Sequence, residues 1–179
     1  MTTDVHYDLA AGPLGAMLIV ARGGMLAGIH FQGGRHLPDV DAGWQRAPSH
    51  PLLRTARAQL DDHFAGGWTG FDLPLAPMGT PFQRAVWNAI ATVPYGTTMS
   101  YRELARRAGR PGSVRAAGTA TGRNPWAIVV PCHRIVGSDG ALTGYAGGLE
   151  RKRALLDLEA QCGAMRTAAF AAGAADRTT

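Results

Sequence analysis

The residues of this chain best suited to chemistry are a cysteine and a histidine side by side, in the run Pro131-Cys132-His133-Arg134. The thiolate is the reactive form of cysteine, and an adjacent histidine with arginines nearby favours it. Adjacent side chains on a strand point to opposite faces, so a direct contact between Cys132 and His133 is not expected. Either the backbone turns sharply here or a bridging group such as a water connects the two. The alternative is a buried, unreactive cysteine that caps a strand.

The neighbouring residues predict the local structure. The run 127–130 is apolar and partly β-branched, which is typical of a strand. Pro131 lacks the backbone N–H that a strand ladder needs, so the strand is expected to stop there. Cys132 is therefore predicted to lie at or just past a strand end.

Composition bounds the class of protein. The chain has 179 residues, 46% of them hydrophobic, which suits one ordinary domain or two small ones. No apolar run approaches the roughly 20 residues that cross a bilayer, and no secretory signal is visible at the start. The two cysteines, Cys132 and Cys162, do not make a disulfide framework. We expect a protein of the cytoplasm, where a free thiol stays reduced.

Charge is distributed unevenly along the chain. Residues 1–79 carry five arginines and seven acids, a balance of −2. Residues 80–160 carry eleven basic residues and five acids, a balance of +6, and this part contains the cysteine. Such a bias indicates a polyanionic partner, usually nucleic acid, although an ordinary solvated surface also accounts for it.

The first part of the chain, residues 1–76, predicts a small α/β domain. Alternating apolar runs and glycine turns indicate strands near 7–9, 16–20 and 25–31, followed by a loop over 33–48. A helix is expected to begin near Ser49, with an apolar stripe formed by Leu52, Ala56, Leu60 and Phe64. Residues 71–75 alternate as in an edge strand.

After a linker at 77–79, residues 80–160 predict a mainly helical domain. Capping boxes at Thr80/Gln83 and Ser100/Glu103 open two helices, and Ser113 opens a third over 114–121. Two short helices joined by a four-residue turn match a helix-turn-helix, and the hairpin expected at Asp139-Gly140 would form its wing. A last helix is predicted over 149–160, and residues 161–179 are expected to form a weakly ordered tail.

These motifs together resemble the O6-alkylguanine-DNA alkyltransferase family. The resemblance covers about residues 80–159 and rests on ordered anchors, among them Asn124-Pro125, Cys132-His133-Arg134 and Gly144-Tyr145-Ala146-Gly147-Gly148. It implies a ribonuclease-H-like domain before a winged helix-turn-helix domain. The implied activity is direct-reversal DNA repair, in which an alkyl group moves once from O6-alkylguanine to the protein, with O4-alkylthymine left open as a second substrate. The implied partner is double-stranded DNA bound through its minor groove by a monomer, with cooperativity left open.

The resemblance also implies a role for each matching residue. Cys132 would accept the alkyl group, His133 would act on it through a water, Glu159 would orient the histidine, and Asn124 would hold the turn beneath. The implied DNA contacts are Tyr101, Ser113, Arg115, Ala116, Gly118 and Arg123. Tyr101 would press on the target phosphate and Arg115 would fill the gap left by the flipped base. The implied pocket residues are Trp126, Val130, Pro131, Tyr145, Ala146, Gly147 and Gly148.

Three positions depart from the family pattern: Trp126, Thr119 and Ala146. Trp126 is expected to reshape one side of the pocket, and Ala146, which offers no hydroxyl, to admit alkyl groups larger than methyl. The reaction needs no metal or cofactor, and the scattered histidines form no zinc motif. Two other functions stay open: a DNA-binding sensor that does not react, and a cysteine–histidine hydrolase that turns over.

Overall fold

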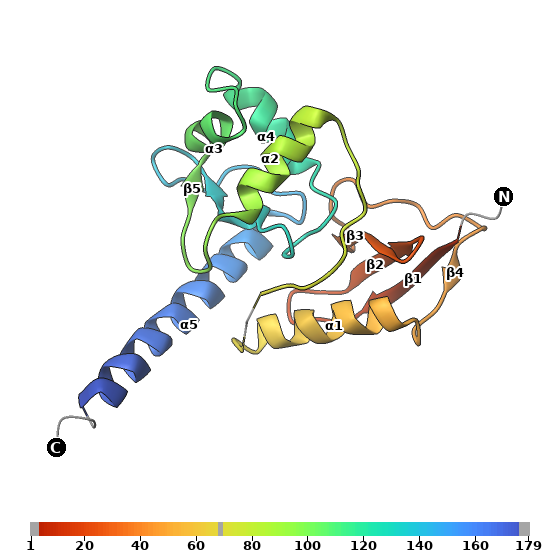
Figure 1. The fold of residues 1–179 in the computed structure, drawn as a ribbon, viewed down its shortest axis with the longest axis horizontal. Coiled ribbons are helices and arrows are strands. Elements are labelled where there is room, and N and C mark those ends of the chain that lie inside the picture. The colour runs from red at the N-terminus through yellow and green to blue at the C-terminus, as the bar shows by residue number, and fades with distance from the viewer. Residues whose placement is uncertain (1–3, 68–69, 176–179) are drawn as a thin grey trace.

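The computed structural model describes residues 4–67 and 70–175. Its N-terminal half is built on a four-stranded sheet with the order β3-β2-β1-β4, shown in Figure 1. The central strands pair antiparallel, and the short β4 pairs parallel to β1. The strands are β1 (Val5–Ala10), β2 (Met17–Arg22), β3 (Met25–Phe31) and β4 (Gln45–Arg46). The three longer strands confirm the sequence prediction, whereas β4 lies inside the segment predicted as loop.

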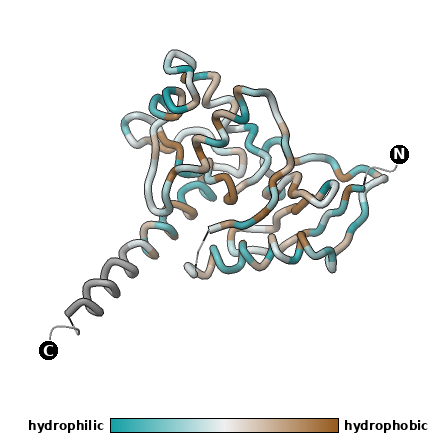
Figure 2. The backbone as a smooth tube through the Cα atoms, in the orientation of Figure 1, coloured by the Kyte–Doolittle hydropathy of each residue, from teal (hydrophilic) through white to brown (hydrophobic). Residues whose placement is uncertain are grey.

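Strand β2 reads as a continuous apolar run because both faces of the sheet are covered. Met17 and Ile19 face the main core, which includes helix α1 (Pro51–Phe64). Leu18 and Val20 belong to a second cluster, which Trp44 covers from the loop after β3. In Figure 2 the hydrophobic stretches accordingly follow the strands and the inner faces of the helices.

The cap of helix α1 lies one residue after Ser49, where the sequence predicted the start of the helix. His50 occupies the cap position without a capping hydrogen bond, and Pro51 opens the helix. The buried face comprises Leu53, Ala56, Leu60 and His63. The predicted stripe is therefore right at its centre, and the burial of His63 was not anticipated.

The segment between α1 and the next helix is not the predicted edge strand. Of residues 71–75, only Leu75 forms a bridge, to Leu26 of β3. Leu26 donates its N–H to Pro74 O (2.7 Å) and accepts one from Ala76 (3.0 Å). Proline at 74 has no N–H to extend a ladder, which explains why the pairing stops.

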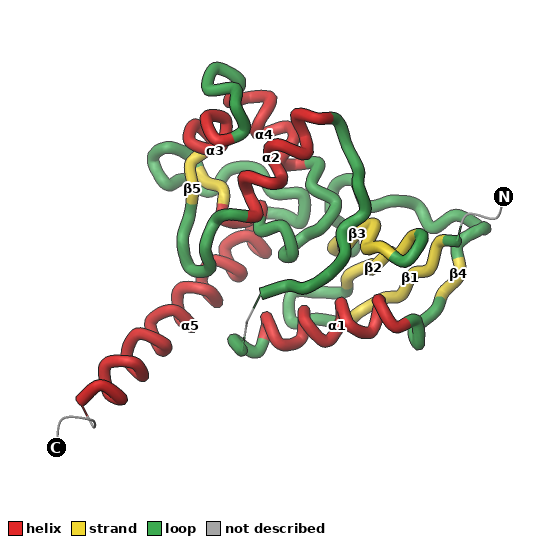
Figure 3. Tube along the Cα trace, viewed as in Figure 1, coloured by secondary structure: helices red, strands yellow, loops and turns green. Residues whose placement is uncertain are grey.

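Three helices and a two-stranded parallel sheet follow. They are α2 (Pro81–Ala91), β5 (Met99–Ser100), α3 (Tyr101–Arg107), α4 (Val114–Gly122) and β6 (Ile135–Val136). Figure 3 labels α2, α3, α4 and β5 among them. The capping box of Thr80 and Gln83 is complete. Ser100 accepts from the Glu103 N–H, but the Glu103 carboxylate binds Arg106 and Arg107 instead of closing a second box.

Two predictions in this region were wrong: the strand over 127–130 and the hairpin at Asp139-Gly140. Residues 127–130 form a turn rather than a strand, and Ile128 adopts a left-handed φ of 72°. Cys132–Arg134 is a single turn of 3₁₀ helix. The turn at Asp139-Gly140 is present, with Gly137 N–H bonded to Ala141 O (2.8 Å), but β6 pairs with β5 and not with a returning strand.

The last helix, α5 (Leu149–Ala175), is longer than predicted and projects from the body of the molecule in Figure 1. The sequence after Cys162 shows no amphipathic period, which led to the prediction of a frayed tail. Alanine, methionine and arginine are strong helix formers, so the helix continues without such a period. Residues 176–179 of the predicted tail lie outside the described residues. Within the described ranges, no helix is both long and apolar enough to cross a membrane.

The two halves meet through backbone pairing and a shared core. Ile29 of β3 donates its N–H to Pro125 O (2.8 Å) and accepts one from Ala127 (3.0 Å). Trp126, between them, donates its indole N–H to Leu26 O (2.8 Å) and packs edge-on against Trp87 at 5.5 Å between ring centroids. One buried cluster runs through both halves. The sheet therefore supports the segment that leads to Cys132.

This packing predicts a large effect of Trp126 on stability. Trp126→Ala should lower the free energy of unfolding by about 3–5 kcal/mol, since it empties a buried site at the junction. Trp126→Phe should cost about 1 kcal/mol for the lost hydrogen bond, because Leu26 O keeps the Ala76 N–H as a partner. Urea unfolding measures both values. Val40→Ala, at a side chain 47% exposed, is the control and should change stability by less than about 0.5 kcal/mol.

Candidate active site

Cys132 is buried at the start of the 3₁₀ turn, with only 4% of its surface exposed. Its Sγ accepts a hydrogen bond from Asn124 Nδ2 at 3.1 Å. Burial raises the pKa of the Cys132 thiol, and the Asn124 hydrogen bond and the positive charge of Lys152 offset only part of that rise. The resting group is therefore a thiol, and it must lose its proton to become a nucleophile.

Asn124 holds together the turn that carries Cys132. Its Nδ2 also donates to Val130 O (2.8 Å) and Trp126 O (3.2 Å), and its Oδ1 accepts the Trp126 N–H (3.1 Å). Because Oδ1 receives a backbone donor, the orientation of the amide is fixed and Nδ2 must face the sulfur. The predicted supporting role of Asn124 agrees with these contacts.

His133 and Glu159 form a fully buried pair. His133 Nε2 lies 2.8 Å from Glu159 Oε1, and neither side chain is exposed. Burial lowers the pKa of His133 despite the opposing effect of Glu159, so the imidazole is neutral. A carboxylate only accepts hydrogen bonds, so Nε2 carries the proton and Nδ1 presents its lone pair. Nδ1 is buried without a hydrogen-bond partner among the described residues, and is thus free to act as a base.

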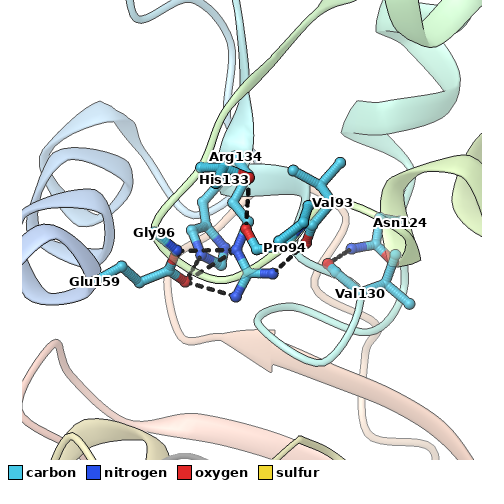
Figure 4. Close-up of polar contacts among 9 residues, drawn as sticks. Val93, Pro94, Gly96, Asn124, Val130, His133, Arg134 and Glu159 are labelled. Atoms are coloured by element: carbon cyan, nitrogen blue, oxygen red, sulfur yellow. Dashed lines mark hydrogen bonds and ion pairs between the residues drawn. The ribbon is translucent and has the colours of Figure 1, made fainter. Parts of the chain in front are cut away.

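Arg134 secures the carboxylate from the other side, as Figure 4 shows. Its guanidinium donates to both oxygens of Glu159 at 2.8–3.1 Å and to Val93 O at 2.6 Å. The backbone N–H of Gly96 adds a bond to Glu159 Oε2 at 3.0 Å. Burial alone would raise the pKa of Glu159, but the hydrogen bonds from His133 and Arg134 prevail and hold it at about 2.

The sequence analysis credited the arginines near Cys132 only with favouring the thiolate, and it gave Lys152 no role. In the structure Lys152 is fully buried and donates to the carbonyls of Ile135 (2.5 Å), Thr143 (2.8 Å) and Gly144 (3.4 Å). Burial lowers the pKa of Lys152 to about 8. Helical spacing offered a signal, since Lys152, Leu155 and Glu159 fall on one face of α5 and are all buried.

A hollow of about 600 Å³ opens beside this cluster, and we call it the tyrosine hollow. Six residues predicted from the sequence line it: Tyr101, Arg115, Gly118, Arg123, Tyr145 and Ala146. Burial raises the pKa of Tyr101 and of Tyr145, and the proximity of Cys132 adds to both shifts. Tyr145, which lines the hollow, lies edge-on to His133 with 6.5 Å between the ring centroids, so the hollow borders the buried Glu159–His133 pair.

The N-terminal half also contributes to the tyrosine hollow, which the sequence analysis missed. Arg35 and His36 line it. The N–H of Arg35 donates to Ala146 O at 2.8 Å and so anchors the loop that carries Tyr145. Tyr101 anchors the same loop from α3, through a hydrogen bond from its hydroxyl to Thr143 O at 3.1 Å.

The other predicted site residues are not among those that line this hollow. Ser113 caps α4 without a side-chain hydrogen bond, and Ala116 is exposed on that helix. Gly147 and Gly148 line a separate hollow near Arg151. Val130, Pro131 and Trp126 are buried in the turn before the cysteine.

Trp126 is not among the residues that line the tyrosine hollow, because its ring packs between the two halves. The position thus gives no support to the expectation that Trp126 reshapes the pocket. Within the part of the chain that the structure describes, no three histidine, cysteine or acidic side chains gather as metal ligands.

Comparison with known proteins places this site in context. A family model described as "6-O-methylguanine DNA methyltransferase, DNA binding domain" matches residues 81–161. The Methylated-DNA--protein-cysteine methyltransferase of Methanosarcina barkeri is 43% identical over 155 residues, which cover 87% of this chain and 97% of that protein. The protein of the same name from Mycobacterium tuberculosis is 44% identical over 155 residues, covering 87% and 92%.

The fold agrees with these relatives. The crystal structure of Mycobacterium tuberculosis OGT in complex with DNA superposes with a TM-score of 0.81 at 43% sequence identity. The match covers 88% of this chain and 94% of that one. Identity and coverage of this extent leave no room for a merely local similarity, and so the chain belongs to the methylated-DNA--protein-cysteine methyltransferase family.

Proposed function

We propose that this protein repairs DNA by direct reversal, taking the alkyl group from O6-alkylguanine onto Cys132 in a single irreversible turnover. The observation that carries the proposal is the buried Glu159–His133 pair beside a thiol that Asn124 holds in place. The names of the relatives and the DNA complex of a solved neighbour support it. O4-alkylthymine is a second candidate lesion for the same chemistry.

The chemistry is one displacement at the alkyl carbon. His133 Nδ1 takes the thiol proton of Cys132 through a bridging water, and Glu159 stabilises the imidazolium that forms. A sulfur lone pair forms the S–C bond while the C–O6 bond breaks and its electrons move into the purine. Overall, the thiol proton replaces the alkyl group on guanine. The thioether offers no carbonyl to water, so the protein is used once.

The DNA is proposed to lie across α3 and α4, which act as a winged helix-turn-helix in the minor groove. Small residues on α4, among them Ala116 and Gly118, let the duplex approach, with Ser113 and Arg123 at the ends of the helix. Arg115 is exposed and would fill the stack when the base flips out, and Tyr101 would press on the target phosphate. The absence of readout side chains on this helix suits a protein that must find lesions in any sequence.

The remaining parts of the proposal concern architecture and setting. The N-terminal sheet and α1 are proposed to form a ribonuclease-H-like domain at residues 1–76, joined to the reactive domain at 80–160. The protein would act as a monomer in the cytoplasm, where Cys132 stays reduced. The repair of groups larger than methyl is proposed because Ala146, at the wall of the tyrosine hollow, is small.

Intact-protein mass separates this function from its two alternatives. Mixed with a duplex that bears one O6-methylguanine, the protein should gain the mass of one methyl group, in proportion to the lesion supplied. The Cys132→Ala variant should gain nothing, and Cys162→Ala should react like the wild type. Tight binding without a mass change would indicate a sensor, and repeated turnover would indicate a hydrolase; either result overturns the proposal.

The buried carboxylate predicts a distinctive acid dependence. Glu159→Gln should lower the free energy of unfolding at pH 7 by about 3–5 kcal/mol, because it leaves Arg134 buried without its counter-charge. The folded-state pKa of Glu159 is depressed, from 4.5 to about 2. Its contribution is therefore complete above about pH 4.5 and is lost as pH falls toward 2, so the gap between wild type and variant should narrow over that window. Denaturant unfolding at a series of pH values measures it.

A second variant controls for the loss of folding. Glu159→Asp keeps the charge but shortens the reach to His133, so it should retain the acid dependence while methyl transfer slows by about a hundredfold or more. The half-buried Glu103 also has a pKa of about 2, from Arg106 and Arg107, but it is unchanged in every variant and cancels in the comparison. A gap that stays constant from pH 7 to pH 3 would contradict the assignment.

A further inference from the structure

A second hollow, of about 390 Å³, lies on the face of the sheet opposite α1, and we call it the sheet hollow. Cavities of this size are typical of small-molecule sites. Its walls come from β2 and β3, from the loop after β3, and from the segment that follows α4. The residues that matter for the argument are Arg22, His36, Pro38, Trp44, Met78 and Arg123.

The sheet hollow combines a flat apolar surface with positive charge. Trp44, Pro38 and Met78 supply apolar walls, and Trp44 is half-buried rather than locked in the core. Arg22 and Arg123, both exposed, also line it, and neither guanidinium forms an ion pair or hydrogen bond with another described residue. An aromatic surface flanked by unpaired arginines fits a planar base that carries a phosphate.

The sheet hollow adjoins the tyrosine hollow, because His36 and Arg123 line both. His36 stands at this boundary with a left-handed φ of 60°, a conformation that non-glycine residues rarely adopt. A strand of DNA that crosses the tyrosine hollow would therefore pass the mouth of the sheet hollow. The position of the sheet hollow beside the tyrosine hollow favours a nucleotide of the bound DNA as the occupant over a free metabolite.

We propose that the sheet hollow is a second nucleotide subsite, in which Trp44 stacks on a base of the DNA strand and Arg22 and Arg123 hold its phosphate. The inference rests on the proposed function, since it requires DNA in the tyrosine hollow. It gives the N-terminal half a direct part in substrate binding. It also places the extra nucleotide against Asn124, whose amide holds Cys132 from the other side.

Equilibrium binding to a duplex with one O6-methylguanine tests the subsite, with every variant made in the Cys132→Ala background so that no lesion is consumed. Arg22→Ala should raise Kd about three- to tenfold and reduce the salt dependence of binding by about one counterion. Trp44→Ala should raise Kd about tenfold through lost stacking. Arg57→Ala is the matched control, since Arg57 is exposed on α1, on the opposite face of the sheet, and should bind like the background protein.

Two measurements make the result decisive. Thermal unfolding shows whether Trp44→Ala still folds, and Arg22→Ala, at an exposed side chain, keeps the test valid if it does not. Photo-crosslinking with 5-iodouracil placed at successive positions beside the lesion should label the peptides that contain Trp44 or Met78. Crosslinks confined to α3 and α4, or equal Kd values for Arg22→Ala and Arg57→Ala, would overturn the subsite.

The source of the nucleotide and the underlying function are tested separately. If free dGMP binds the protein and the Trp44→Ala change abolishes that binding while Kd for DNA is unchanged, the occupant is a free nucleotide and the proposal is wrong. If wild-type protein gains no methyl mass from the duplex, the proposed repair function fails. If the wild type is methylated but Arg22→Ala binds the duplex as Arg57→Ala does, the repair function stands and only the subsite is wrong.

Discussion

The structure depends on a single buried carboxylate. Glu159 reaches from α5 into the interior and binds the imidazole of His133, the guanidinium of Arg134 and the N–H of Gly96. Two ions removed from water are stable only when their hydrogen bonds are complete, and here every oxygen of the carboxylate has donors. The network joins the last helix, the 3₁₀ turn and the loop after α2, so the geometry of the reactive turn and the packing of the C-terminal half are set together.

The sequence predicted which side chains lie together around Cys132 better than it predicted the backbone that carries them. The pairing of Cys132, His133 and Glu159 followed from the family resemblance, and the capping box at Thr80 followed from local chemistry. The strand predicted over 127–130 failed because the hydrogen bonds of Asn124 and the left-handed Ile128 impose a turn that no local propensity favours. Buried polar residues such as Lys152 were missed because their acceptors are carbonyls distant in sequence, which a residue pattern does not reveal.

The N-terminal half has more influence on the site than its sequence suggested. The sequence analysis placed no candidate site residue there, yet β3 pairs with the residues on both sides of Trp126, and Arg35 fixes the loop of Tyr145 through Ala146. These contacts are made by backbone atoms, so they leave no signature in side-chain composition. The sheet thus supports the turn that carries Cys132. Residues 1–79 and 80–160 differ in charge and pattern along the chain, but in the folded protein they share one buried core.

The shortest sheet in the molecule has a particular consequence. Strand β5 ends where Tyr101 begins α3, and β6 begins where the 3₁₀ turn of Cys132 ends, and the two strands pair through only Met99–Ile135 and Ser100–Val136. These two paired positions fix where Tyr101 lies relative to Cys132 along the strands. A shift of this pairing by one residue would displace Tyr101 relative to Cys132 by about 3.3 Å along the strand. It would also turn the paired side chains to opposite faces of the sheet. Four residues therefore set the position of Tyr101 relative to Cys132.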